Sequence, residues 1–218
     1  MTEDKQEDGS DWYEFAFGQF LRDQGVREPA GQPVPAAMVP GDGYIGMTGP
    51  NYRVQFSMTE GGISSLRFGG KELCDRIPRI SFWRAMTDND NGAGYPALMA
   101  PWYAAGHFMK KRYEDFKLEP TEGGIRMVTA FSAGIHDEIR VKVTYTAYVD
   151  GRILVEAEFP GVPGYPDMPV FAMDLCVPAS LDQVSYLGFG PEENYPDRLS
   201  GAELGVLPIP PWRISPGT

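Results

Sequence analysis

RVKVTYTAY (Arg140–Tyr148), followed by Asp150-Gly151 and then by RILVEAEF (Arg152–Phe159), is the stretch that decides the fold class. In both runs apolar and polar residues alternate, which is the period of a β-strand with one face in a core. An Asp-Gly pair between two such runs is the strongest short-range signal for a hairpin turn. The stretch therefore predicts an antiparallel β-hairpin.

Similar runs lie on both sides of this hairpin. Val170–Pro178 predicts one more strand, and only Pro96–Gly106 is typical of a helix. The remaining strand candidates form two pairs, each separated by glycines: Tyr52–Met58, Ile63–Phe68, Phe116–Glu119 and Ile125–Phe131. Because strands and helices do not alternate as a parallel sheet requires, we expect an all-β, antiparallel sandwich.

The two ends of the chain differ from this β-rich middle. Residues 1–10 are polar and acidic, and we expect a mobile acidic tail there. Trp12–Leu21 alternates as a strand does, whereas residues 31–46 are rich in Pro and Gly and are expected to form a linker. We place the main domain at residues 47–205. Residues 206–218, again rich in Pro, are expected to be an irregular tail.

Composition and charge limit what the chain can bind. The chain has 218 residues, 42% of them hydrophobic and 12% aromatic, which suits a folded globular protein. Its net charge of −11 repels phosphate groups. We therefore expect no nucleic-acid partner and no contact with an anionic membrane surface.

Cys74 and Cys176 are the only cysteines. Two cysteines at this spacing provide neither a disulfide framework nor a zinc site, so we expect buried thiols in a reducing compartment. Met1–Gly9 lacks the apolar region of a signal peptide, and no apolar run is as long as a transmembrane helix. We therefore expect a cytoplasmic protein.

The candidate acid–base residues of this chain do not have the spacing of a catalytic centre. Glu192 and Glu193 are adjacent carboxylates, whereas a glycosidase needs two carboxyl groups that face each other across a sugar. Neighbours on an extended chain point to opposite faces, which disfavours a catalytic pair here. His107 and His136, the only histidines, are isolated and show no metal-ligand spacing.

Two other patterns have both a functional and a structural interpretation. DNDNG at Asp88–Gly92 is similar to a calcium loop, but Gly92 stands where an EF-hand requires Asp or Asn. A polar loop with Asx turns is therefore favoured. Tryptophans can stack on sugars, but most of them fill cores, and a core role is favoured. They are Trp12, Trp83, Trp102 and Trp212.

Two long segments resemble signatures of one known family. FWRAMTDNDNG (Phe82–Gly92) resembles the FWRAPTDNDxG segment in the final domain of family 2 β-galactosidases. GFGPEENYPDR (Gly188–Arg198) resembles the GxGPxENYPDR segment of the same domain, and Trp102 with Ala105-Gly106 is similar to its W…AG segment. This domain also occurs on the small chain of two-chain β-galactosidases. The order and the length of the matching segments make the resemblance specific.

The resemblance implies a fold. Residues 47–205 would be a partial supersandwich similar to galactose mutarotase, truncated at its C-terminal side. Residues 11–30 would hold the last strand or strands of a preceding immunoglobulin-like domain. The resemblance thus covers roughly Trp12 to Gly205 and is incomplete at both ends.

The resemblance also implies a function. The family hydrolyses terminal β-galactosides such as lactose with retention, and its catalytic glutamates, Mg and Na lie in a (β/α)₈ barrel that this chain lacks. We therefore expect no catalytic residue, metal or cofactor here. The partners implied are that barrel, or a large chain carrying it, and the galactoside substrate. The chain would be a non-catalytic domain or subunit that completes the active-site pocket and the assembly.

The signature residues are expected to serve domain packing in preference to direct sugar contact. They are Phe82, Trp83, Arg84, Asp88, Asn89, Asp90, Glu193, Asn194, Tyr195, Asp197 and Arg198. Three departures from the family are evident. Met86 replaces a Pro, Pro169–Ala172 replaces Pro-Arg-Ile-Gly, and Gly205–Thr218 does not follow the family's continuation.

Two other functions fit the same sequence. A stand-alone carbohydrate-binding module would use exposed aromatic side chains on the sandwich. A mutarotase-like aldose epimerase would need a His and a carboxylate that move protons at the anomeric carbon, with His107 and His136 as the candidates.

Overall fold

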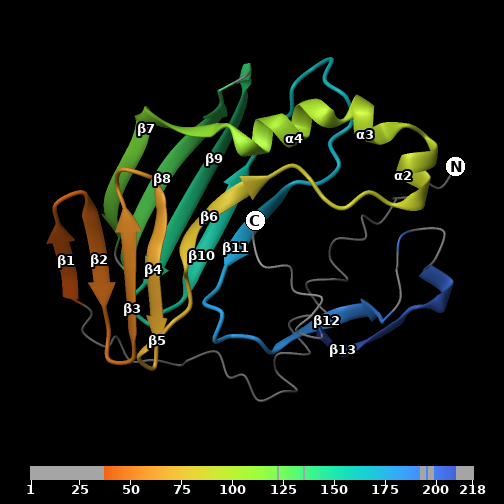
Figure 1. Ribbon diagram of the computed structural model, residues 1–218. Helices are drawn as coiled ribbons and strands as arrows, with labels where there is room; N and C mark the ends of the chain where they lie inside the picture. Colours follow the sequence, from red (N-terminus) through yellow and green to blue (C-terminus); the bar gives the residue numbers. More distant parts are fainter. Residues whose placement is uncertain (1–36, 122, 135, 192–194, 196–198, 210–218) are drawn as a thin grey trace, which may run out of the picture.

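Two antiparallel sheets face one another in the computed structural model, which describes residues 37–121, 123–134, 136–191, 195 and 199–209 (Figure 1). The first sheet has five strands in the order β1-β2-β3-β4-β5. They are β1 (Ala37–Gly41), β2 (Tyr44–Thr48), β3 (Tyr52–Ser57), β4 (Gly62–Phe68) and β5 (Lys71–Glu72). The second has four strands in the order β10-β9-β8-β7. They are β7 (Met109–Thr121), β8 (Gly124–Ala133), β9 (His136–Tyr148) and β10 (Ile153–Glu158).

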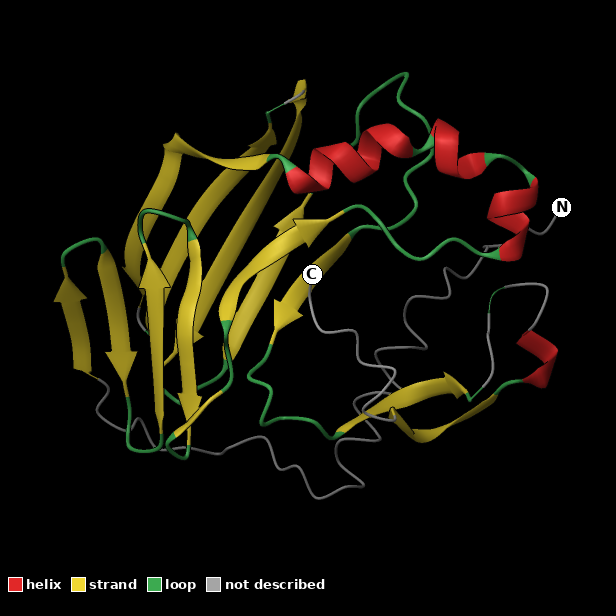
Figure 2. Cartoon of the chain, in the orientation of Figure 1, coloured by secondary structure: helices red, strands yellow, loops and turns green. Residues whose placement is uncertain are grey.

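Two small sheets and a helical segment complete the described chain. β6 (Arg76–Ser81) pairs with β11 (Ala172–Cys176), and β12 (Val184–Gly190) pairs with β13 (Glu203–Ile209), which follows the short 3₁₀ helix η1 (Leu199–Gly201). The helices α2 (Asp88–Gly92), α3 (Tyr95–Leu98) and α4 (Ala100–His107) follow one another between β6 and β7. Figure 2 shows them along one end of the sheets. The prediction of an all-β, antiparallel sandwich is confirmed.

The predicted hairpin is present as β9 and β10, which pair from Ile153 opposite Ala147 to Glu158 opposite Lys142. Its turn uses both residues of the Asp-Gly pair. Gly151 has φ +92°, a conformation that side chains disfavour, and the Asp150 carboxylate accepts hydrogen bonds from the backbone N–H and the guanidinium of Arg152. The local sequence thus sets the register of the two strands.

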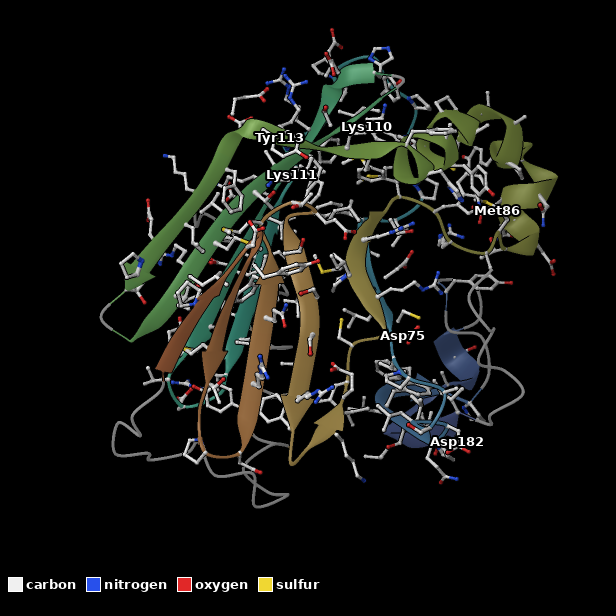
Figure 3. The ribbon with its side chains drawn as sticks, turned by 60° about the vertical axis from the view of Figure 1, so that its left-hand side comes forward. Asp75, Met86, Lys110, Lys111, Tyr113 and Asp182 are labelled. Carbon is white, nitrogen blue, oxygen red and sulfur yellow. The ribbon has the colours of Figure 1, made fainter. Side chains whose placement is uncertain are left out.

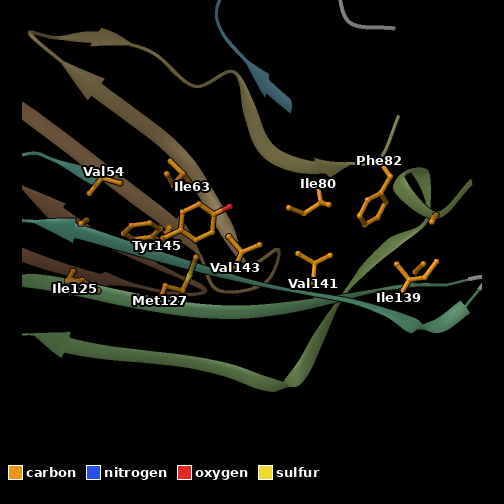
Figure 4. Close-up of a cluster of buried hydrophobic side chains, with 14 of the residues drawn as sticks. Val54, Ile63, Ile80, Phe82, Ile125, Met127, Ile139, Val141, Val143 and Tyr145 are labelled. Atoms are coloured by element: carbon orange, nitrogen blue, oxygen red, sulfur yellow. The ribbon is translucent and has the colours of Figure 1, made fainter. Parts of the chain in front are cut away.

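The core fills the space between the two main sheets (Figure 4). Val54, Phe56 and Ile63 face it from the five-stranded sheet, and the four-stranded sheet contributes a longer row of buried residues. These are Ile125, Met127, Ile139, Val141, Val143, Tyr145 and Ala147. In β9 they stand at every second position, so the alternation that predicted a strand also builds the core.

Three segments differ from their predicted structure. Residues 31–46 were expected to be a linker, but β1 and the start of β2 lie there, and Pro40 is accommodated because β1 is an edge strand. Residues 206–218 were expected to be irregular, but β13 extends to Ile209, with Pro208 in a sheet of only two strands. The expected polar loop at Asp88–Gly92 is the short helix α2.

The cysteines also differ from expectation. Cys74 and Cys176 are free thiols that are half-buried, not fully buried. The predicted tail at residues 1–10, the immunoglobulin-like strand at 11–30, Trp12 and Trp212 lie outside the described residues.

Candidate functional site

The first signature segment begins where β6 ends and forms the helix α2. Thr87 caps this helix: its hydroxyl accepts a hydrogen bond from the Asp90 N–H at 3.2 Å, and the Asp90 carboxylate accepts one from the Thr87 N–H at 2.8 Å. The two bonds form a capping box, which satisfies backbone donors that a helix start leaves unpartnered. Thr87 was not singled out from the sequence, although a Thr three residues before an acidic residue is the signal for this motif.

Arg84 holds the same carboxylate from the other side. Its Nη1 donates to Asp90 Oδ2 at 2.7 Å and its Nη2 to Asp90 Oδ1 at 3.3 Å, the two-pronged geometry that only a guanidinium provides. Its Nε also donates to the carbonyl of Pro169, a residue distant in the sequence, at 3.1 Å. The hydrogen bonds from Arg84, followed by that from the Thr87 N–H, lower the pKa of Asp90 to about 2. Asp90 is therefore a fixed anion at neutral pH.

Phe82 anchors the segment in the core and has no exposed surface. Its ring lies 5.3 Å from that of Trp102, 5.5 Å from that of Phe159 and 6.0 Å from that of Phe171. Trp102 is only 2% exposed, and its Nε1 donates to the carbonyl of Pro166 at 2.8 Å. The structural interpretation of Trp102 holds, because this tryptophan joins α4 to the loop before β11 and presents no face to a sugar.

The outer side of the segment has exposed polar and aromatic groups. Trp83 is partly buried, with its ring edge-on to Tyr103 at 5.3 Å, and Tyr103 in turn lies 4.3 Å from the ring of His107. Asp88 and Asn89 stand on the exposed side of α2. The first signature therefore divides into an inner set that shapes the loop and an outer set at the surface.

Met86 stands where the resemblance leads one to expect a Pro (Figure 3). The residue lies directly before the capping Thr87 and is half-buried. The loop keeps a defined shape without the Pro, because the Arg84–Asp90 pair on one side and the capping box on the other fix the backbone at both ends of this turn.

The second signature is described only in part. Gly188 and Gly190 lie in β12, where a Cβ at Gly190 would lie 2.5 Å from Leu207 Cδ1 and from the hydroxyl of Tyr186, so these side chains would have to shift. Tyr195 is half-buried. Glu192, Glu193, Asn194, Asp197 and Arg198 lie outside the described residues.

Among the described residues, the histidine candidates do not converge with a carboxylate in a cleft. His136 Nδ1 lies 3.9 Å from Glu138 Oε2, but both side chains are exposed at the start of β9. A shallow depression of about 550 Å³ beside β9 and β10 contains one carboxylate, that of Glu158, which pairs with Lys142 at 2.7 Å. Within the described residues, no group of three or more His, Cys, Asp or Glu side chains could hold a metal ion.

Lys111 is a half-buried cation that the sequence did not reveal. From β7 its ammonium donates to the carbonyl of Met58, next to the turn between β3 and β4 in the opposite sheet. The ammonium also lies 3.9 Å from the centre of the Phe116 ring and 4.8 Å from that of Tyr113, and burial lowers the pKa of Lys111. Lys111 therefore ties the two sheets together at this end (Figure 3). No periodicity marks such a contact, because it depends on an irregularity in the pairing of β7 between Arg112 and Lys117.

Comparison with protein-family models shows to which family the chain belongs. Residues 48–208 match the family model of the β-galactosidase small chain. The chain belongs to the β-galactosidase small-chain family. The match begins at Thr48, the last residue of β2, and so spans β3 to β5, the four-stranded sheet, the helices, and the β12–β13 hairpin almost to its end.

Individual relatives of this small-chain domain support the same family assignment. The chain is 36% identical over 195 residues to a β-galactosidase of Clostridium acetobutylicum and 38% identical over 179 residues to one of Lactobacillus delbrueckii subsp. bulgaricus. It covers 22% and 17% of their lengths, while 89% and 82% of this chain is aligned. A β-galactosidase small subunit of Latilactobacillus sakei is 30% identical over 204 residues, with 82% of this chain and 63% of that subunit covered.

The small-chain domain thus spans about a fifth of the β-galactosidases that it matches and less than two thirds of the small subunit. In the part of the chain that the structure describes, no helix is long and apolar enough to cross a membrane.

Proposed function

We propose that this chain is a non-catalytic part of a retaining β-galactosidase that hydrolyses terminal β-galactosides such as lactose. Its role is to complete the active-site pocket and to stabilise the assembly. Membership of the small-chain family supports the proposal, as do relatives that are named β-galactosidase and β-galactosidase small subunit.

The arrangement of the first signature carries the proposal. Arg84 and Asp90 bind each other, and Phe82 fills the core, so these residues hold a loop in one shape, which supports a structural role. A retaining glycosidase needs two carboxyl groups about 5–5.5 Å apart across a sugar. In this proposal another part of the enzyme, a (β/α)₈ barrel with its Mg and Na, supplies them.

The outer side of the same loop is then one wall of the active-site pocket. Trp83 and Tyr103 offer aromatic edges, and the exposed Asp88 and Asn89 offer polar groups at the start of α2. Such a surface fits the wall of a pocket that excludes water from a sugar. Two free thiols, Cys74 and Cys176, agree with a reducing, cytoplasmic location, which forms part of the proposal.

The test is reconstitution. The partner is the L. delbrueckii β-galactosidase with the region that matches this chain deleted, called here the truncated relative. Neither protein alone is expected to hydrolyse o-nitrophenyl β-galactoside, whereas the mixture is expected to do so and to release galactose first as the β-anomer. Turnover by this chain alone, or a mixture that stays inactive, would overturn the proposal.

Two further measurements separate the other functions. Calorimetric binding of galactose or lactose by the lone chain at millimolar or lower Kd, together with an inactive mixture, would assign a stand-alone carbohydrate-binding module. Faster equilibration of fresh α-galactose, followed by polarimetry, would assign an aldose epimerase; a loss of that rate in the His136→Asn variant would place its base in the His136–Glu138 pair.

A further inference from the structure

Within the part of the chain that the structure describes, the core of the sandwich is left uncovered over β10. Residues that pair directly on antiparallel strands share a face, so Val155 and Ala157 of β10 stand on the same face as their buried partners Tyr145 and Val143 of β9. Yet Val155 is 39% exposed, and Ala157 is exposed as well. The apolar face of the four-stranded sheet thus extends beyond the residues that bury it.

The strands that follow are uncovered too. Together with β10 they form what we call the open half, the strands β10, β11, β12 and β13, which lie on the side of the sandwich away from β1 and β2 (Figure 1). Every buried hydrophobic residue of the described chain lies between Met47 and Ala147, before the open half begins. The open half instead exposes large apolar side chains: Leu154, Val155, Leu175, Val184, Tyr186, Phe189, Leu204 and Val206.

A two-stranded hairpin is marginal in water without a layer to pack against. Most residues of β12 and β13 are exposed, on both faces of the hairpin, and Leu204 is 61% exposed. Large exposed apolar side chains on two paired strands are typical of an interaction site. The open half therefore requires a covering partner.

The charge of the open half indicates the chemistry of that partner. From Ile153 to Ile209, the described residues include no Lys or Arg. They do include six carboxylates: Glu156, Glu158, Asp167, Asp174, Asp182 and Glu203. Figure 3 shows Asp182 at the β12–β13 end of the molecule. A second copy of this chain would bring like charges together, whereas a surface with Lys or Arg among apolar residues would pair with these carboxylates.

Resting on the function proposed above, we infer that the open half is the surface on which the remainder of the β-galactosidase docks. The partner surface is apolar and carries Lys or Arg side chains that face Asp174 and Asp182. The open edge of β10 is the place where a strand of that partner adds to the four-stranded sheet, because an edge strand presents unused backbone donors and acceptors.

Hydrogen exchange locates the interface. The intact chain is measured alone and with the truncated relative, and protection is expected in β10, β12 and β13. Protection confined to α3, α4 and the first signature would overturn the inference. So would sedimentation of the lone chain as a dimer that exposes no apolar surface to a hydrophobic dye.

Charge reversal tests the chemistry. The double variant Asp174→Lys with Asp182→Lys is expected to raise the Kd for the truncated relative at least tenfold at low salt. The matched control, Asp42→Lys with Glu60→Lys, makes the same charge change in exposed turns of the five-stranded sheet and is expected to leave the Kd within twofold. Circular dichroism confirms that both variants are folded.

The outcomes separate the two proposals. Restored hydrolysis with equal Kd values for the two double variants would overturn the docking surface and leave the proposed function standing. Absence of both binding and hydrolysis would overturn the two together.

Discussion

The guanidinium of Arg84 and the carboxylate of Asp90 bind through two hydrogen bonds, of 2.7 and 3.3 Å, and so close a loop of the first signature segment. The same guanidinium reaches the carbonyl of Pro169, so one side chain joins the start of α2 to the segment that leads into β11. The resemblance singled out both residues, and in the structure they hold the loop closed.

Arg84→Lys is expected to loosen this loop. A lysine ammonium cannot bind both carboxylate oxygens and the Pro169 carbonyl in the geometry of a guanidinium. We expect the melting temperature to fall by about 2–4 °C, the shift for one lost net hydrogen bond in a chain of this size. Arg67→Lys, at the more exposed pair with Glu72, is the control and should cost less. Equal shifts in the two variants would contradict the assignment.

Phe82→Ala is expected to destabilise the protein by about 3–5 kcal/mol, the usual cost of removing a fully buried aromatic ring. The cavity would lie among the rings of Trp102, Phe159 and Phe171. Urea unfolding followed by tryptophan fluorescence measures the effect. Phe68→Ala is the control, because Phe68 is 37% exposed and should cost less than half as much. A similar loss from both variants would show that the cluster does not hold the segment.

Gly61 and Gly70 allow the cost of a steric clash to be measured at two positions with the same backbone φ. Both have φ +78°, so an Ala at either position has the same left-handed strain, of about 1–2 kcal/mol. A Cβ at Gly61 would also lie 2.5 Å from Thr129 Oγ1, whereas nothing lies within 4 Å at Gly70. We therefore expect Gly61→Ala to lower the free energy of unfolding more than Gly70→Ala. Equal urea midpoints would mean that Thr129 moves aside at no cost.

The acid sensitivity of the fold should depend on Glu72. Burial by itself would raise its pKa, but hydrogen bonds from Ser65, the Leu66 N–H, Arg67 and the Cys74 N–H lower the pKa to about 2. Because the pKa is lower in the folded state than in the unfolded state, Glu72 stabilises the fold at pH values above about 4.5. That stabilisation, on the order of 3 kcal/mol, is lost as the pH falls from about 4.5 to 2.

Urea unfolding between pH 7 and pH 2 checks this. Glu72→Gln is expected to be less stable than the natural protein at pH 7 and to lose less stability on acidification. Ser65→Ala removes one donor and should fall between the two. A slope remains in the Glu72→Gln variant, because Asp90 also has a pKa of about 2. Parallel pH curves for the natural protein and Glu72→Gln would contradict the assignment.

The sequence predicted β3, β4 and the strands from β7 to β11, because alternation and turn residues act locally. The β9–β10 hairpin is the clearest case, since the residues that form its turn are also those that gave the signal. The sequence did not predict β2, β5, β6 or β12. β1 and β13 were missed because Pro40 and Pro208 argue against a strand unless one knows that the strand lies at an edge. That knowledge comes only from the assembled sheet.

The sequence predicted which residues form the candidate site, but it did not predict which groups they contact. Resemblance indicated Phe82, Arg84 and Asp90, but the helix α2 depends on the capping by Thr87, and the Pro169 carbonyl is distant in the sequence. Lys111 could not be found from the sequence, because its partner Met58 lies 53 residues away, in the turn after β3 of the opposite sheet. Such contacts follow from tertiary packing, which no local pattern encodes.

The distribution of burial along the chain also sets an order of events during synthesis. All of the buried hydrophobic side chains of the described residues, from Met47 to Ala147, are translated before β10. The two main sheets can therefore collapse on each other while the later strands are still being made. The acidic, uncovered strands come last, and during translation they remain accessible until the rest of the molecule is ready to receive them.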